Sequence, residues 1–180
     1  MTTITLPTTG VWAIDPSHSA VTFSARHLMA ARVRGAFKAF SGQINVSDSP
    51  EASTVNVSID AASIDSGVED RDNHLRSPDF LDVENHPTLE FASSAVRAIS
   101  GGYAVDGALT IRGTTKPVTL EMEYLGVVAD PWGNEKALFS AKTQIDREAY
   151  GLVWNAPLEA GGWLVGKTVD IELEVQATLS

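Results

Sequence analysis

The sequence contains no cysteine, so disulfide bonds, thiolate metal sites and cysteine nucleophiles are excluded. It also has no apolar run near the ~20 residues that cross a bilayer, so we expect no membrane span. The formal net charge of -10 argues against a nucleic-acid partner, because phosphate binding needs a basic surface. What remains is an ordinary globular composition, with 43% hydrophobic residues in a chain of 180, enough for one domain with a real core.

Several sequence signatures are missing as well. Neither a nucleophile elbow (Gly-x-Ser-x-Gly) nor a glycine-rich phosphate loop occurs, which disfavours serine hydrolases and nucleotide enzymes. The first ten residues lack the basic start and apolar centre of a signal peptide. We therefore expect a cytoplasmic protein, with residues 1–10 as a flexible N-terminus and residues 11–180 as a single domain.

The pattern that is present is alternation of apolar and polar residues, which is typical of half-buried strands. Residues 167–179 show it most clearly and would form a strand about 40 Å long at ~3.3 Å per residue. Antiparallel strands joined by turns indicate a sandwich or a closed barrel. Strands of this length favour an elongated barrel, and eight strands leave a lumen wide enough for a small ligand.

Small residues occur on the face that the pattern turns inward. Because protein interiors are close-packed, they indicate either a cavity or bulky partners opposite them. Gly35 and Gly42 predict a bulge or a sharp twist, and a bulge at Gly35 or Gly107 would invert which side chains face inward. The small inward residues are Ala25, Gly107, Ala137, Ala141 and Ala177.

Residues 70–91 interrupt the alternation with a polar, irregular segment that holds His74 and His86. Such a segment in a β chain is either a cap or site, or a surface connection with one helical turn. We expect Arg71 and Arg76 to form local ion pairs with the aspartates around them.

The histidines do not have the spacing of a metal site. His18 and His27 are nine residues apart, which places them on opposite faces of a strand, and no His-x-Glu-x-His pattern occurs. We expect no metal. His18 is typical of a hydrogen-bonded turn. His27, at a strand end, is either a polar rim residue or an anchor for a ligand head group, and the same choice applies to Arg147.

Six motifs spread over nearly the whole chain resemble those of one protein family, the YceI-like family. They are Trp12-x-Ile14-Asp15-x-x-His18-Ser19-x-Val21-x-Phe23-x-x-x-His27, Gly35-x-Phe37-x-x-Phe40-x-Gly42, Asn73-His74-Leu75-Arg76-Ser77-x-Asp79-Phe80-Leu81-Asp82, Gly107-x-Leu109-Thr110-Ile111-x-Gly113-x-Thr115-Lys116-Pro117-Val118, Ile145-Asp146-Arg147-x-x-Tyr150-Gly151 and Val165-Gly166-Lys167-x-Val169-x-Ile171.

The resemblance implies an all-β fold, an extended eight-stranded antiparallel lipocalin-like β-barrel with a short helical cap. It also implies a non-enzymatic binding or carrier protein whose lumen holds a long isoprenoid lipid, either a polyprenyl phosphate or an isoprenoid quinone. Dimers are common in the family, so we expect a homodimer. Many members carry a secretion signal, which the present N-terminus does not resemble.

Burial of an isoprenoid tail is driven by apolar area, so the expected ligand-binding residues are apolar and inward-facing. Three of them belong to the cap, and weaker candidates contact the head group. The barrel residues are Phe23, Phe37, Val57, Ile59, Phe91, Leu109, Ile111, Leu120, Met122, Phe139 and Ile171; the cap residues are Leu75, Phe80 and Leu81; the head-group candidates are His27, His74 and Arg147. No catalytic residue and no cofactor besides the lipid are expected.

Two other functions are compatible with the same residues. One is a small-molecule hydrolase or isomerase that uses His27 or His74 as a general base. The other is a filled barrel without a ligand, which acts as a structural or stress-related partner protein.

Overall fold

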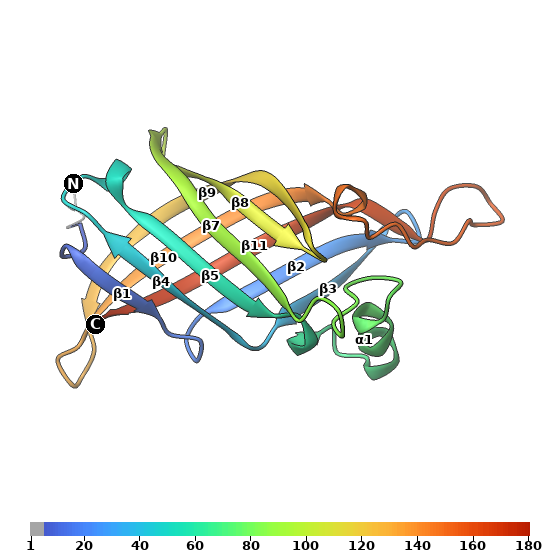
Figure 1. Ribbon diagram of the computed structural model, residues 1–180, viewed down its shortest axis with the longest axis horizontal. Coiled ribbons are helices and arrows are strands. Elements are labelled where there is room, and N and C mark those ends of the chain that lie inside the picture. Colours follow the sequence, from blue (N-terminus) through green and yellow to red (C-terminus); the bar gives the residue numbers. More distant parts are fainter. Residues whose placement is uncertain (1–5) are drawn as a thin grey trace.

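The strands form an elongated barrel with both chain termini at one end and helix α1 at the other (Figure 1). The computed structural model describes residues 6–180, so half of the expected flexible N-terminus lies outside the described residues. The strands are β1 (Gly10–Ile14), β2 (Ala20–His27), β3 (Ala31–Phe37), β4 (Phe40–Val46), β5 (Thr54–Asp60), β6 (Ile64–Asp65), β7 (Thr88–Ile99), β8 (Gly102–Ile111), β9 (Thr114–Ala129), β10 (Glu135–Asp146) and β11 (Val165–Leu179).

Eight of these strands close a ring in the order β1-β4-β5-β7-β8-β9-β10-β11, with β1 paired to β11. Every pairing is antiparallel, as at Trp12 and Leu179, where the first and last strands meet. β2 also pairs with β11, and β3 and β6 extend the wall from there toward the helical end. The predicted all-β, eight-stranded antiparallel barrel with a short helix is confirmed.

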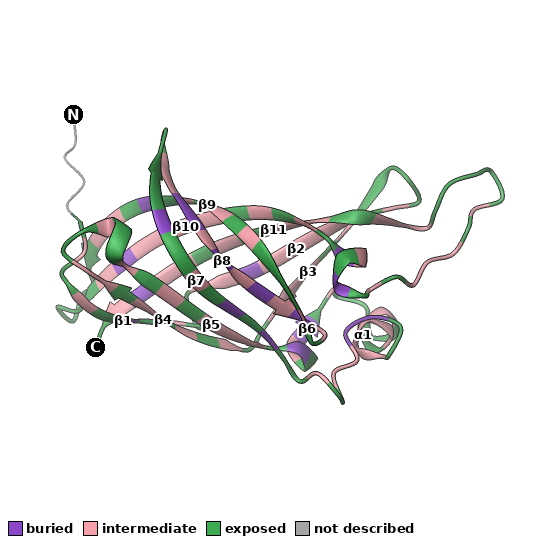
Figure 2. Cartoon of the chain, turned by 45° about the horizontal axis from the view of Figure 1, so that its top comes forward, coloured by how far each residue is buried: buried purple, intermediate pink, exposed green. Residues whose placement is uncertain are grey.

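Alternation along the strands places the core inside the barrel. On β8 the buried positions include Val105, Leu109 and Ile111, and on β7 Leu89 and Phe91. Buried and exposed residues alternate visibly along the same strands in Figure 2. Since the period of a strand is two, every second side chain enters the lumen and the others face water.

Two glycines of the wall make room for aromatic rings. Gly35 lies opposite Phe23 on the neighbouring strand, and a Cβ atom at Gly35 would clash with the Phe23 ring. A Cβ atom at Gly107 would lie 2.5 Å from Cζ of Phe91. Of the bulge or sharp twist predicted at Gly35, the bulge is absent, because the β2–β3 register is continuous there. The register shift of the β7–β8 hairpin lies on β7. Inward and outward parity therefore runs through both glycines without inversion.

We expect Gly35→Ala to destabilise the fold by about 1–3 kcal/mol, because the added methyl group forces the Phe23 ring out of its position. Chemical denaturation measures the change. In the double variant Gly35→Ala/Phe23→Leu the clash is relieved, so the two effects should be clearly non-additive. Additive effects would show that the Phe23 ring is not what requires glycine.

β1, at the end of the barrel near the termini, contributes Trp12 to the interior. This side chain has no exposed surface and packs against Ala137 and Ala177, which are also fully buried. The Trp12 indole nitrogen donates a hydrogen bond of 2.8 Å to the Thr8 carbonyl. Two of the small inward residues thus have a bulky partner opposite them, one of the two outcomes that the sequence left open.

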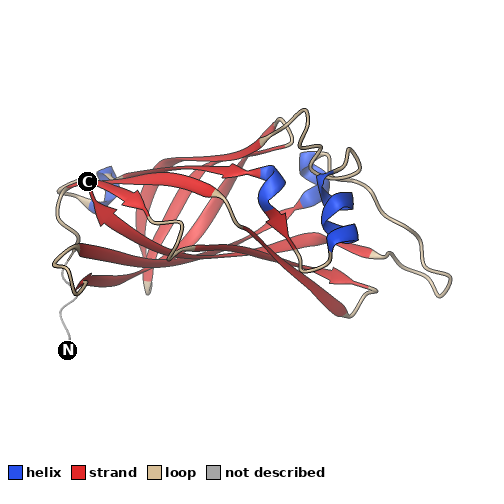
Figure 3. Cartoon of the chain, turned by 90° about the horizontal axis from the view of Figure 1, so that it is seen from below, coloured by secondary structure: helices blue, strands red, loops and turns tan. Residues whose placement is uncertain are grey.

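Helical segments gather at the opposite end (Figure 3). They are α1 (Glu69–Arg76) and the 3₁₀ helices η2 (Ala61–Ser63) and η3 (Arg147–Tyr150), whereas η1 (Pro50–Ala52) lies near the termini. α1 has acidic residues in its first turn and basic ones in its last, which suits the helix dipole. It ends at Ser77-Pro78, because proline cannot continue a helix. We call residues 66–87 the cap.

Arginines attach the cap by hydrogen bonds to backbone carbonyls. Arg76 donates to the carbonyls of Ala62 and Ile64, at 2.8 and 2.9 Å. Arg71 donates to the hydroxyl and the carbonyl of Ser66. The expected ion pairs of Arg71 and Arg76 with neighbouring aspartates are therefore wrong. The donors of the two guanidinium groups are taken up by η2, β6 and Ser66 instead.

Two further properties concern the part of the chain that the structure describes. Among residues 6–180, no helix has the length and apolar character needed to cross a membrane. Within the same range, no three His, Asp or Glu side chains come together in a group that could hold a metal ion.

Candidate functional site

A cavity of about 470 Å³ occupies the barrel lumen, and its wall is almost entirely apolar. Its lining reaches from Pro7 and Asp48, near the termini, to Leu75 and Phe80 of the cap. The volume lies within the range of small-molecule sites, but the lining shows an elongated shape. Two of the small inward residues, Ala25 and Ala141, line this space, which is the other outcome that the sequence left open.

The structure brings all fourteen apolar candidates to one wall. The side chains from the barrel and the three from the cap belong to the same lining, although they come from segments far apart in the chain. Their contact with a ligand stays a prediction. They are Phe23, Phe37, Val57, Ile59, Leu75, Phe80, Leu81, Phe91, Leu109, Ile111, Leu120, Met122, Phe139 and Ile171.

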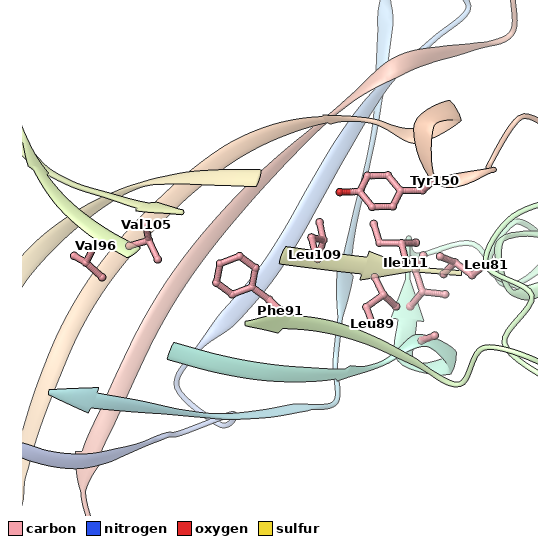
Figure 4. Packing of buried hydrophobic residues seen from close by; sticks show 10 residues of the cluster. Leu81, Leu89, Phe91, Val96, Val105, Leu109, Ile111 and Tyr150 are labelled. Atoms are coloured by element: carbon pink, nitrogen blue, oxygen red, sulfur yellow. The ribbon is translucent and has the colours of Figure 1, made fainter. Parts of the chain in front are cut away.

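A cluster of buried residues reaches into the cap half of the lumen. Leu89, Phe91, Leu109 and Ile111 belong to one buried cluster there, which Figure 4 shows between the strands. Tyr150 enters the same cluster from η3. Leu81 of the cap is also part of the cluster and is 6% exposed, so the cap packs onto this half.

Neither histidine candidate for the head group lies on the cavity wall. His74 turns away toward Asp79, with Nε2 2.8 Å from Oδ2, and its ring packs edge-on against Trp154 at 4.6 Å. His27 lies at the end of β2, opposite Ala31 and Val165. The head-group role predicted for His27 and His74 stays a prediction.

Arg147, the third head-group candidate, does line the cavity and is 4% exposed. Its guanidinium donates to four backbone carbonyls, those of Leu152 (2.6 Å), Gly166 (2.8 Å), Trp154 (3.0 Å) and Val165 (3.3 Å). Burial lowers the pKa of Arg147, and the carboxylates of the adjacent Asp146 and Glu148 oppose this shift. Arg147 thus fixes the loop after η3 to β11 and brings a buried positive charge to the wall.

Tyr150 was not among the predicted site residues, although it belongs to the motif that contains Arg147. Its side chain is 2% exposed, and its ring extends from η3 into the barrel interior above Ile111 (Figure 4). Among residues 6–180, its hydroxyl is the buried side-chain polar atom for which no hydrogen-bond partner is present. Burial raises the pKa of this hydroxyl, so it stays protonated and able to donate. An unpartnered buried hydroxyl costs about 1–3 kcal/mol.

The sequence prediction also missed other lining residues, because it assigned inward positions to only part of each strand. Tyr103 and Tyr124 line the cavity from β8 and β9, and their inward parity could have revealed them. Burial raises the pKa of Tyr124, as does the nearby Glu135 carboxylate, and its ring packs 5.3 Å from Phe139. Leu152 and Val165 flank an irregular loop, where no alternation exists that would assign a direction to a side chain.

The lining bears on the two alternative functions. The residues that line the lumen within the described chain include no histidine, so the structure does not place His27 or His74 where either could act as a general base on a molecule in the lumen. The filled barrel requires a packed lumen, whereas the structure contains a cavity.

Comparison with known proteins gives one family. The model of the YceI-like domain matches residues 12–177. A UPF0312 protein of Serratia proteamaculans is 40% identical over 136 residues, which cover 75% of this chain and 71% of the relative. The crystal structure of Burkholderia cenocepacia BcnA is 25% identical, with a TM-score of 0.78, and the match covers 91% of this chain and 98% of BcnA.

A more distant structure shares the fold. It is described as a polyisoprenoid binding domain from Saccharophagus degradans implicated in plant cell wall breakdown. The two chains are 13% identical with a TM-score of 0.68, and the match covers 94% of this chain and 98% of the other.

Proposed function

The chain belongs to the YceI-like family, and from this premise we propose that it is a non-enzymatic binding or carrier protein for a long isoprenoid lipid held in the barrel lumen. The observation that carries the proposal is the apolar cavity that reaches from the end near the termini to the cap. The similarity of the fold to a domain described as polyisoprenoid-binding supports the choice of lipid.

The dimensions of the lumen suit a long, thin ligand. β10 has 12 residues, which span about 40 Å along the strand at ~3.3 Å per residue. A strand tilt of about 40° reduces this to about 30 Å along the barrel axis. A flexible apolar tail fills such a space better than a compact molecule of equal volume.

The chemistry of the wall indicates how the tail would be held. Burial of apolar surface contributes about 25 cal/mol per Å², without any need for directional contacts. The aromatic rings of Phe23, Phe91 and Phe139 and the adaptable side chain of Met122 provide this surface on different strands. A wall of this kind selects for length and apolar character more than for a particular polar group.

Affinity should therefore rise with tail length until the lumen is full. For a series of prenylated quinones with one head group, we expect roughly tenfold or larger gains with each added isoprene unit at first, since each buried CH₂ contributes about 0.8 kcal/mol. The gains should then stop at the length that fills the barrel. Titration by native mass spectrometry or by displacement of a fluorescent fatty probe measures the series.

An affinity independent of tail length would place the ligand outside the lumen and overturn the proposal. The variant Leu125→Asp serves as a control for non-specific effects, because Leu125 is half-exposed on β9 and absent from the cavity wall. It should reproduce the wild-type series. The homodimer and the cytoplasmic location stay predictions.

A further inference from the structure

The cap end of the lumen contains two polar groups that the apolar wall does not explain. The Tyr150 hydroxyl is buried without a partner among the described residues, and Arg147 places a buried positive charge on the same wall. Both belong to the single turn η3. A phenylalanine at position 150 would fill the same space without burying a hydroxyl, so packing alone does not account for the tyrosine.

The two groups have hydrogen-bond donors left over. Four of the five guanidinium N–H groups of Arg147 bind backbone carbonyls, which leaves one N–H on Nη2 without a partner among residues 6–180. The Tyr150 hydroxyl supplies the second donor. Both groups can donate, and the Tyr150 hydroxyl oxygen is the one free acceptor on these two side chains, so the pair suits an oxygen atom that accepts hydrogen bonds.

The charge of the surroundings indicates that this oxygen is neutral. Arg147 is the single cation among the lining residues of the described chain, and the remaining charged residues on the wall are the acidic Asp48 and Glu174. A buried phosphate needs several donors and compensating cations. One N–H and one hydroxyl cannot meet that need, whereas they can bind a carbonyl oxygen.

We propose that Tyr150 and Arg147 form a hydrogen-bonding subsite for a neutral carbonyl oxygen of the bound lipid, such as that of a quinone. The head group then lies inside the barrel beneath the cap, and the isoprenoid tail extends toward Asp48 and the termini. This inference rests on the proposed function, since it assigns the head group and the direction of the same lipid.

The test compares three ligands with the same tail, namely a polyprenylated benzoquinone, the polyprenyl monophosphate and the hydrocarbon without a head group. Wild-type protein and Tyr150→Phe are titrated with each by native mass spectrometry. We expect Tyr150→Phe to bind the quinone roughly tenfold more weakly, with unchanged affinity for the hydrocarbon. The wild type should also bind the quinone more tightly than the phosphate.

Binding of the hydrocarbon distinguishes failure of the subsite from failure of the proposed function. Unchanged quinone affinity in Tyr150→Phe, beside normal hydrocarbon binding, overturns the subsite and leaves the proposed function in place. Tighter binding of the phosphate than of the quinone also overturns it. If none of the three ligands binds to the wild type, the proposed function itself fails. The thermal midpoint of ligand-free Tyr150→Phe should not fall, because the variant removes an unpartnered buried hydroxyl.

Discussion

Met122→Asp should lower the affinity for an isoprenoid lipid by roughly a hundredfold or more. Met122 lies on β9 between Tyr103 and Ala141 and lines the cavity. A carboxylate there keeps its water while the lumen is empty, but an entering tail must remove that water. Desolvation of an ion without a partner costs several kcal/mol, and about 3 kcal/mol already corresponds to a hundredfold change. Titration with a prenylated quinone measures the loss.

Leu125→Asp is the matched control for this variant. This variant also replaces an apolar residue of β9 by aspartate, but the Leu125 side chain is 50% exposed to water. Its affinity for the quinone should equal that of the wild type. Equal losses in the two variants would mean that aspartate weakens binding through the strand and not through the lumen.

Arg147→Met should destabilise the fold by about 4 kcal/mol, since four backbone carbonyls lose their donor at once. For a domain of this size that corresponds to a fall of roughly 10 °C in the thermal midpoint. Arg147→Lys should recover little of the loss, because a lysine ammonium cannot bridge the same set of carbonyls. Thermal denaturation followed by circular dichroism measures both variants.

Arg97→Met is the control for loss of a positive charge. The Arg97 side chain is 56% exposed and pairs with Asp106 at the surface, where an ion pair contributes little. Its thermal midpoint should change far less than that of Arg147→Met. Similar midpoints for the two variants would show that the carbonyl contacts of Arg147 do not hold the loop after η3.

The barrel could be predicted from the sequence because strand periodicity is a local property. The alternation of Val169, Ile171 and Leu173 along β11 identifies the inward face without knowledge of the other strands. The same alternation predicts that Leu109 and Met122 face the lumen, and both line the cavity. Prediction of the closed ring required the family resemblance, because the pairing of β1 with β11 leaves no local pattern in the sequence.

The polar part of the site could not be predicted in the same way. The role of Arg147 depends on carbonyls that a loop without periodicity brings to it, at Leu152 and Trp154. His74 is held outside the lumen by Trp154, which is 80 positions later in the chain. Tyr150 is set apart by the absence of a partner for its hydroxyl, which is a property of the folded interior alone.

Native mass spectrometry of freshly purified protein, with solvent extraction of bound material, tests most directly whether the lumen holds an isoprenoid lipid. We expect a bound species whose extracted mass belongs to a series spaced by isoprene units. A clean ligand-free mass, unchanged after incubation with prenylated quinones and polyprenyl phosphates, would contradict the proposed function.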